Sequence, residues 1–359
     1  MIKIPKGEVN PVLKSTLYVI EHAKSVKINR EKIKELAEKW VKGKMEIPSR
    51  PAEDILDAAD ERKILDYLII LDTLNFCFWS PFAKASEDRP SFSEASEGRT
   101  IQRGKWKIEY KGKRYDGYFA LSLALKRFFE DNPKKANIEY FSRVSFGDFC
   151  CILKGKGDLQ FLRERWRGVK LVSKVLSLKY NGDSRNFVKS AKNKFSILVP
   201  KIYKELPTFD DIAEYGGKKI YLLKRAQILA CDICFAIKKE NFSANFPGKA
   251  GKGIGYFSDL DYLTAMPDYK LPQILFHRGV LSYSYELAGK VNNKVLIPTG
   301  SEEEVEIRAA TVWSVEYLKE ELAVLGRNFH SYELDWILWA ESQKEKMKNN
   351  YHLTKSIYY

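Results

Sequence analysis

The sequence predicts a mainly α-helical protein with one small β-hairpin. Apolar residues recur near every 3.6 positions in residues 52–72 and again in residues 158–180, which is the spacing of a helix with one buried face. Residues 106–118 instead alternate around the tripeptide KGK at 111–113, which is typical of a hairpin. Hydrophobic residues make up 45% of the chain, which is enough for a folded core.

The other elements follow from the same periodicity and from turn residues. A helix is expected after the hairpin, at about 118–130, and the polar stretch 83–100 is expected to be a loop. The sequence NGDS at 181–184 ends the helix over 158–180, and Ser184 can cap the next helix. Further helices are expected over residues 186–205, 219–239, 270–289, 302–325 and 332–347.

Several residues mark the ends of these helices. Asp259 or Asp261 can cap a short helix, and Ser301 followed by Glu304 has the form of a capping box. The Gly-rich stretch 245–255 contains neither a phosphate-binding loop ending in GK[ST] nor a dinucleotide fingerprint, so we expect a flexible loop there.

The chain shows no repeat of 20–50 residues and no clear linker. We therefore expect one α-helical domain over residues 1–359. In it, an N-terminal helical part of about 1–150 packs on a C-terminal part of about 151–359.

Charge and cysteine content narrow the functional classes. Lys and Arg number 61 and Asp and Glu number 47, so the net charge is +14, which suggests an anionic partner. No apolar run approaches 18 residues, and the N-terminus has no signal-peptide pattern. The five cysteines are odd in number and have apolar neighbours, which indicates reduced thiols in a cytoplasmic protein. Cys231 and Cys234 lack a second pair of ligands, so no metal is expected.

Two strings combine polar groups with apolar or aromatic neighbours. In LNFCFWS at 74–80, Asn75 lies among large aromatic residues, which either form a stacking wall for a flat ring or pack in the core. In YLLKRAQILACD at 221–232, Lys224 and Asp232 lie on one face of a helix. Either the two charges are paired or used in a site, or the face is a solvated edge on which Lys224 extends to water.

Two further strings place carboxylates at helix starts. Asp268 lies between two prolines with a helix beginning after it, where backbone N–H groups stabilise a carboxylate; the alternative is an ordinary helix cap. Residues 300–308, GSEEEVEIR, contain four glutamates in five positions, which either form a solvated first turn or bind a cationic group. The string LDWILW at 334–339 is expected to face the core.

Eight strings, taken together and in this order, resemble the queuosine salvage protein family, whose members are queuosine 5′-phosphate N-glycosylases. They span almost the whole chain except its first fifty residues and its Lys-rich loops. The strings are LNFCFWS (74–80), YKGKRYDGYFAL (110–121), PTFDD (207–211), YLLKRAQILACD (221–232), LTAMPDYKLPQIL (263–275), GSEEEVEIRA (300–309), LDWILW (334–339) and SIYY (356–359).

The resemblance implies a hydrolase that cleaves queuosine 5′-monophosphate into queuine and ribose 5-phosphate, and we expect no cofactor. It also implies a helical fold similar to that of helix-hairpin-helix DNA glycosylases. In the family, residues at the positions of Asp268 and Lys224 belong to the active site. Queuine is a 7-deazaguanine, so the leaving base lacks the usual protonation site. We therefore expect Asp268 to stabilise an oxocarbenium-like transition state or to activate water. Lys224 would hold Asp268 ionised or bind the ribose or phosphate.

The other candidate residues are assigned to parts of the substrate by residue type. The queuine amine is cationic and calls for an acidic partner, the flat base calls for aromatic walls, and the phosphate calls for a cation. The candidates are Asp232, Asp259, Glu304 and Glu306 for the amine; Phe78, Trp79, Tyr118, Phe119 and Tyr269 for the base; Asn75 and Gln273 for the base edge or ribose; and Arg308 and Lys224 for the phosphate.

Two other functions compete with this one. A DNA or RNA base glycosylase fits the implied fold and the net charge of +14, but the glycine-rich hairpin followed by Lys and Asp of those DNA enzymes is absent from the sequence. A non-catalytic transfer-RNA-binding protein would bind RNA without releasing a base. Much of the positive charge lies in the Lys-rich stretches 24–44, 185–204 and 343–355, outside the matching strings. We therefore expect a small nucleotide substrate, no stable nucleic-acid partner, and an oligomeric state that the sequence leaves open.

Overall fold

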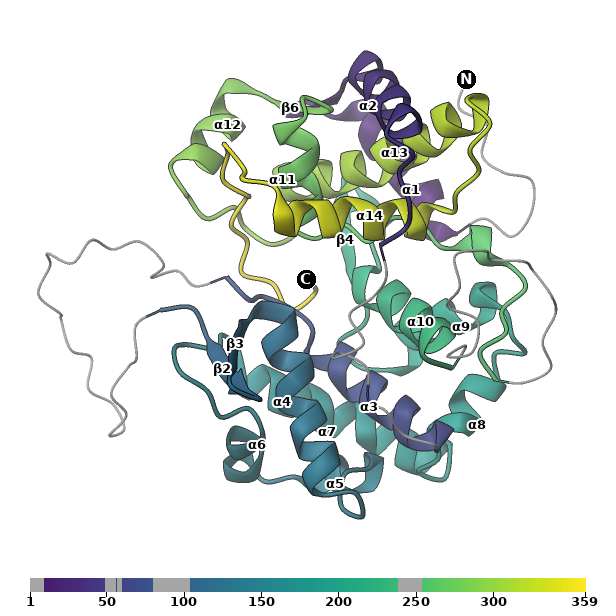
Figure 1. The fold of residues 1–359 in the computed structure, drawn as a ribbon, viewed down its shortest axis with the longest axis vertical. Helices are drawn as coiled ribbons and strands as arrows, with labels where there is room; N and C mark the ends of the chain where they lie inside the picture. Colours follow the sequence, from purple (N-terminus) through teal and green to yellow (C-terminus); the bar gives the residue numbers. More distant parts are fainter. Residues whose placement is uncertain (1–9, 49–55, 57–59, 80–103, 238–253) are drawn as a thin grey trace, which may run out of the picture. The chain divides into compact units, whose positions relative to one another are not determined.

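The structure, a computed structural model, describes residues 10–48, 56, 60–79, 104–237 and 254–359 (Figure 1). Within these ranges the chain forms fourteen α-helices and three two-stranded antiparallel sheets, so the prediction of a mainly α-helical protein is confirmed. No helix in the described part of the chain is long and apolar enough to cross a membrane.

The chain divides into two compact units. Unit 1 comprises residues 1–49 and 187–359, and unit 2 comprises residues 50–186. The N-terminal segment thus groups with the C-terminal half, and the boundary lies near residue 187 where we predicted a division near residue 150. The single-domain organisation stays a prediction.

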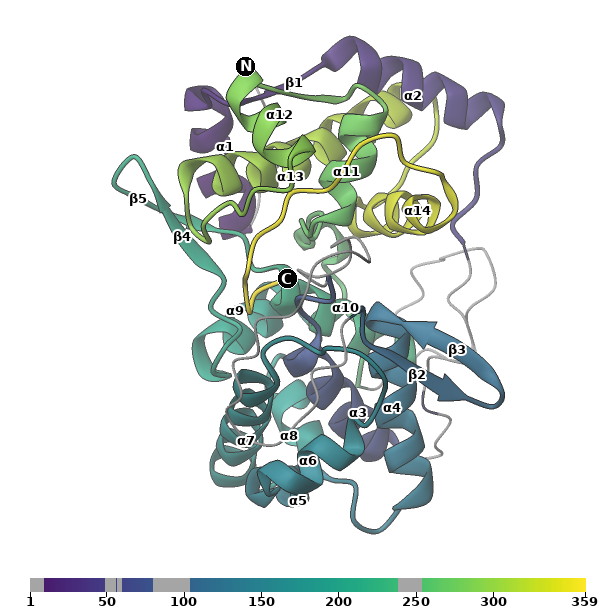
Figure 2. The same ribbon diagram turned by 90° about the vertical axis from the view of Figure 1, so that its left-hand side faces the viewer.

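Unit 1 is built around a long helix that is buried on nearly all sides. This helix, α13, runs from Glu302 to Val324 and packs against α1, α2, α11 and α14, as Figure 2 shows. The other elements are α1 (Pro11–His22), β1 (Val26–Ile28), α2 (Arg30–Lys42), α9 (Phe195–Glu205), β4 (Ile212–Tyr215), β5 (Lys218–Tyr221), α10 (Lys224–Ile237), the 3-10 helix η3 (Leu260–Tyr262), α11 (Lys270–His277), β6 (Leu281–Tyr283), α12 (Tyr285–Asn292) and α14 (Ser331–Lys344).

Two of the sheets lie in unit 1, and neither was predicted. Strands β4 and β5 form a hairpin whose turn, Gly216-Gly217, has both residues at positive φ, as a tight hairpin turn requires. Strand β1 pairs with β6 across more than 250 residues of sequence, with Val26 opposite Tyr283. The helix predicted over 219–239 is wrong at its start, because β5 occupies 218–221 and α10 begins only at Lys224.

Unit 2 confirms the predicted hairpin and the helix predicted after it, while most of the first part of the helix predicted over 52–72 lies outside the described residues. Strands β2 and β3 pair with Lys107 opposite Asp116, and β2 packs on the helix that follows. The predicted loop at 83–100 lies outside the described residues. The elements are α3 (Glu61–Leu74), β2 (Lys107–Tyr110), β3 (Lys113–Asp116), α4 (Gly117–Asp131), α5 (Ile138–Arg143), α6 (Phe146–Ile152) and α7 (Leu162–Lys179), while α8 (Ser184–Lys189) crosses the boundary to unit 1.

Two predicted helices are interrupted. The helix predicted over 186–205 breaks between α8 and α9, where Lys192 and Asn193 both have positive φ. The helix predicted over 270–289 ends at His277, and Gly279, with φ of 72°, turns the chain into β6 before α12 begins. Both breaks occur at left-handed residues, which do not fit inside a right-handed helix.

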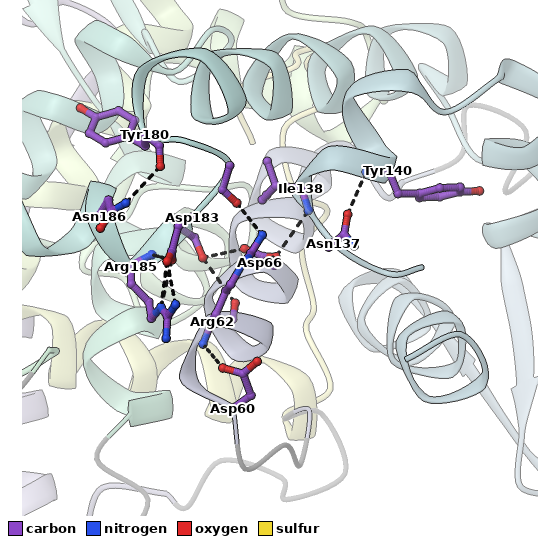
Figure 3. Close-up of polar contacts among 12 residues, drawn as sticks. Asp60, Arg62, Asp66, Asn137, Ile138, Tyr140, Tyr180, Asp183, Arg185 and Asn186 are labelled. Carbon is purple, nitrogen blue, oxygen red and sulfur yellow. Dashed lines mark hydrogen bonds and ion pairs between the residues drawn. The ribbon is translucent and has the colours of Figure 1, made fainter. Parts of the chain in front are cut away.

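Helix caps differ from the predictions because partners distant in sequence compete for them. Ser184 is the first residue of α8, and its hydroxyl donates to Asp66 Oδ1 at 2.6 Å, while Asp183 Oδ1 accepts the Arg185 backbone N–H at 2.9 Å. Figure 3 shows Asp66 and Asp183 in this region. Asp259 does not cap η3 with its side chain; its two oxygens accept the backbone N–H groups of Phe195 and Ser196 at the start of α9, at 2.7 and 2.9 Å.

Ser301 confirms half of the predicted capping box. Its Oγ accepts the backbone N–H of Glu304 at 3.4 Å, which caps α13. The Glu304 carboxylate, however, accepts the backbone N–H of Gly300 at 2.9 Å, one residue before the predicted donor. The other oxygen of Glu304 is taken by Arg308, one turn further along the helix.

Candidate active site

Asp268 lies at the beginning of α11, in the buried segment that joins η3 to this helix. The residue is 8% exposed, and Oδ1 accepts the backbone N–H groups of Lys270 at 2.6 Å and Leu271 at 2.9 Å. The predicted placement of a carboxylate at a helix N-terminus is confirmed. Among the described residues, these hydrogen bonds use only Oδ1 of Asp268. Helix α11 therefore fixes the orientation of the carboxylate through one oxygen.

Lys224 is the first residue of α10 and is also buried. Its backbone N–H donates to Oδ2 of Asp211 at 3.0 Å. The preceding residue, Leu223, has φ of 49°, which is unusual for a bulky side chain. Contacts around the turn into α10 must therefore hold the backbone in this conformation. Asp232, two turns later in α10, is buried as well.

Asp211, Arg308 and Glu304 form a buried charge cluster. Arg308 on α13 donates from Nη1 to Asp211 Oδ1 at 2.9 Å and from Nη2 to Asp211 Oδ2 at 2.6 Å, which is a bidentate ion pair. Nη1 also donates to Glu304 Oε1 at 3.3 Å. Burial alone would lower the pKa of Arg308, but the two carboxylates outweigh it and raise that pKa above its usual value.

The same guanidinium reaches the chain next to Asp268. Arg308 Nε donates to the backbone oxygen of Pro267 at 3.1 Å. One arginine therefore contacts both the residue before Asp268 and the carboxylate that holds the backbone of Lys224. The structure thus places Asp268, Lys224, Glu304 and Arg308 of the predicted site around one charge cluster in unit 1.

The end of the chain packs on this cluster. The Arg308 guanidinium lies 4.3 Å from the centre of the Tyr359 ring, and Tyr359 is buried. His352 Nε2 lies 3.3 Å from the Tyr359 hydroxyl. Burial, helped by the charge of Arg308, lowers the pKa of His352 to about 3, so its ring is neutral at physiological pH. Tyr359, the last residue of the string SIYY, thus packs on the buried charge cluster.

Two of the predicted acidic residues are occupied by the protein itself. Glu306 accepts the backbone N–H groups of residues 24, 25 and 26 and the hydroxyl of Tyr215, at 2.7 to 3.1 Å. Asp259 uses both oxygens to cap α9. Binding of the queuine amine by either residue stays a prediction, and their visible role is to hold backbone segments in place.

Gln273 and Tyr269 connect α11 with the chain near residue 350. Gln273 Nε2 donates to the backbone oxygen of Asn349 at 2.8 Å, and Asn349 Nδ2 donates to the backbone oxygen of Gln273 at 3.2 Å. The ring centroids of Tyr269 and Tyr351 are 4.9 Å apart. Both predicted residues therefore lie on the first turn of α11 or next to it, close in sequence to Asp268.

The other aromatic candidates and Asn75 lie in unit 2. Asn75 ends α3 and donates from Nδ2 to Asp72 Oδ1 at 3.2 Å. Trp79 is buried, and Phe78, Tyr118 and Phe119 are half-buried. A side chain at Gly117 would lie about 4.0 Å from Cβ of Phe78, so the strings LNFCFWS and YKGKRYDGYFAL meet within this unit. Their role as walls for a base stays a prediction.

Sequence reasoning missed Arg165, which shapes the aromatic string. This fully buried residue of α7 donates to the backbone oxygens of Leu74, Phe76 and Cys77, and its guanidinium lies 4.1 Å from the Phe76 ring centre. Cys77 has φ of 45°, so the turn is strained. One sign of this role is visible in the sequence, because Arg165 occupies a position on the apolar face of the helix predicted over 158–180.

Asp211 was also missed as a site residue, although it ends the matching string PTFDD. Its partner in the ion pair lies 97 positions away, and periodicity gives no sign of such a contact. Among the described residues, no group of three or more His, Cys, Asp or Glu side chains could hold a metal ion.

Comparison with known proteins identifies relatives along nearly the whole chain. The profile of the queuosine salvage protein family matches residues 56–359. A Sphaerobacter thermophilus protein named queuosine 5′-phosphate N-glycosylase/hydrolase is 34% identical over 355 residues, which cover 98% of this chain and 99% of the relative. Proteins of the same name from Dictyostelium discoideum and Bos taurus are 32% and 30% identical, covering 97% and 82% of this chain and 98% and 81% of their own lengths.

Proposed function

Because this chain belongs to the queuosine salvage protein family, we propose that it hydrolyses the N-glycosidic bond of queuosine 5′-phosphate. The products are queuine and ribose 5-phosphate. Relatives from bacteria and eukaryotes carry the name of this activity and match the chain over most of its length. The observation that carries the proposal is Asp268, a carboxylate fixed through one oxygen by the start of α11 and joined through Pro267 to a buried arginine.

The chemistry requires a carboxylate on the sugar side. During hydrolysis the bond between C1′ and the base nitrogen breaks with its electron pair on the base, and positive charge develops on the ribose ring. Asp268 stabilises this charge and takes a proton from the attacking water, whose oxygen forms the new bond to C1′. The proton finally reaches the base nitrogen, which balances the reaction.

Lys224 supports this reaction as a cation. A buried ammonium either keeps Asp268 ionised or binds the ribose or the phosphate, and both roles need charge in the same region. The substrate is a free nucleotide in the cytoplasm, and the protein has no stable nucleic-acid partner.

The test is the substitution Asp268→Asn. Asparagine keeps an oxygen that can accept the N–H groups of Lys270 and Leu271, so the thermal midpoint should stay nearly unchanged. Queuine release from queuosine 5′-monophosphate, measured by mass spectrometry, should fall about 1,000-fold, within the range that general acid–base catalysis contributes.

The matched control is Asp60→Asn, which changes a helix-capping aspartate of α3 whose Oδ1 accepts the backbone N–H of Arg62 at 3.0 Å. This variant should keep wild-type turnover. Substantial turnover by Asp268→Asn would remove Asp268 from the catalytic role. Absence of queuine release by the wild-type protein itself would overturn the proposed activity.

A further inference from the structure

We propose that Asp211 is a positioning residue. Through its buried ion pair with Arg308 it holds Lys224 and Asp268 in a fixed position relative to each other. This inference rests on the proposed function of these two residues. It assigns a role to a residue of unit 1 that does not itself act on the substrate.

Asp211 holds the start of α10 with both its backbone and its side chain. Its backbone oxygen accepts the N–H groups of Leu222 at 3.0 Å and Leu223 at 3.1 Å, and its Oδ2 accepts that of Lys224 at 3.0 Å. Three successive N–H groups therefore bind one residue. This explains how Leu223 is kept at positive φ, and it fixes the position of the Lys224 backbone.

The carboxylate of Asp211 also aligns Arg308. Two parallel hydrogen bonds orient the planar guanidinium, and four of its five N–H donors bind Asp211, Glu304 and Pro267. The donor to Pro267 is Nε, which is rigidly coupled to the two Nη atoms. A change in the orientation of the guanidinium must therefore move or release the peptide that leads into Asp268.

The arrangement is costly, which indicates that it serves the site. Asp211 is 3% exposed and Arg308 is 1% exposed. Burying such a pair loses the hydration of both charges, and apolar residues of similar volume often stabilise a protein as well or better. Catalysis, in contrast, gains from groups held in place before the substrate arrives, because a misplacement of about 1 Å can cost about 100-fold in rate.

The first experiment compares amide hydrogen exchange in the wild-type protein and in Asp211→Asn, without substrate. Asparagine offers Arg308 one acceptor oxygen in place of two. Exchange should accelerate about ten-fold or more in two segments that are distant in sequence, residues 222–224 and residues 267–271, in which Pro267 itself carries no N–H. Acceleration in 222–224 alone would mean that Asp211 acts only on its local turn, and the inference would be wrong.

Arg308→Lys separates the two branches of this arrangement. Lysine keeps the positive charge but loses the bidentate contact and the bond from Nε to Pro267. Exchange should accelerate in 267–271 and stay near wild type in 222–224, because Asp211 binds Lys224 directly. This variant also decides the matter if Asp211→Asn does not fold, since equal exchange in 267–271 would contradict the link.

The second readout is kinetic. Asp211→Asn should lower kcat about 100-fold with KM changed less than about three-fold, because the misplaced groups act on the transition state. In an Asp268→Asn background the same substitution should cost much less, since the group that it positions is already gone. Full additivity of the two losses, or an unchanged kcat, would overturn the inference.

Asp66→Asn is the matched control. Asp66 is an aspartate of unit 2 that is 1% exposed, and the substitution is the same. It should leave exchange in 222–224 and 267–271 and the value of kcat near wild type. If the wild-type protein released no queuine, the proposed function would fail, while the exchange experiments would still decide whether Asp211 couples the two segments.

Discussion

Asp211 in unit 1 and Asp66 in unit 2 are two buried aspartates whose partners differ in charge. Asp211 faces the guanidinium of Arg308 through two hydrogen bonds. Asp66, on α3, accepts the hydroxyl of Ser184 at 2.6 Å and the backbone N–H of Ile138 at 3.4 Å, while the nearest guanidinium nitrogen, from Arg62, is 3.9 Å away (Figure 3). Both carboxylates lose their hydration on burial. A full positive charge offsets this loss for Asp211, and mainly neutral hydrogen-bond donors offset it for Asp66.

The difference shows what each carboxylate does for the protein. The pKa of Arg308 is raised, so this partner stays charged at every physiological pH. Burial raises the pKa of Asp66 to about 6, although Ser184 and Arg62 act in the opposite direction. Unit 1 therefore carries an arginine that stays charged beside the proposed catalytic residues, and unit 2 carries a carboxyl group that titrates within the range used for assays.

Removal of the charged partner should have the largest effect on stability. Arg308→Met leaves Asp211 and Glu304 buried without the cation between them, and we expect a loss of about 3–5 kcal/mol in the free energy of unfolding. Urea unfolding followed by circular dichroism measures this loss. Arg62→Met is the comparison in unit 2, where the partly exposed arginine should contribute about 1 kcal/mol or less to its pair with Asp66. Similar losses in both variants would contradict the distinction between the two sites.

Local features of the sequence predicted most helices and the position of Asp268. The periodicity in 158–180 and the residues around Asp268 act over one or two turns, which is the range over which side chains of one helix interact. Strands β2 and β3 were predicted because they alternate on either side of a recognisable turn, whereas β4 and β5, of the same length, lay at the edge of an apolar pattern that was read as helix. Strand β1 finds its partner β6 only in the folded chain.

The polar connections of the site depend on contacts between residues far apart in sequence. Asp259 caps a helix that begins more than 60 positions earlier, and Asp211 pairs with an arginine 97 positions later. Neither residue differs locally from an ordinary surface aspartate. Arg165 is the exception, because an arginine on an apolar helix face already indicates a buried role.

The titration of Asp66 should make stability depend on pH. Its pKa is higher in the folded protein than the ordinary value of 3.8, so its contribution is fully present below pH 3.8 and is lost as pH rises through about 6. The free energy of unfolding should therefore fall by roughly 3 kcal/mol over this range, relative to Asp66→Asn. Denaturant unfolding at several pH values measures the difference. A difference between the two proteins that does not vary with pH would show that Asp66 is not the group responsible.

Ser184→Ala should have the smallest effect of these substitutions, and it tests the neutral partner of Asp66 directly. The hydroxyl of Ser184 is the strongest influence that lowers the pKa of Asp66, so its removal should raise that pKa above about 6. The cost in stability should be about 1 kcal/mol where Asp66 is ionised, since one hydrogen bond to a buried acceptor is lost. Carbon-13 NMR of the Asp66 carboxyl group follows the pKa directly. Ser142→Ala, which removes a hydroxyl that donates to the backbone oxygen of Glu139 at 2.7 Å, should leave it unchanged. If Ser184→Ala left the pKa of Asp66 in place, the neutral hydroxyl would not be its effective partner, and the contrast with Asp211 would have to rest on Ile138 and Arg62.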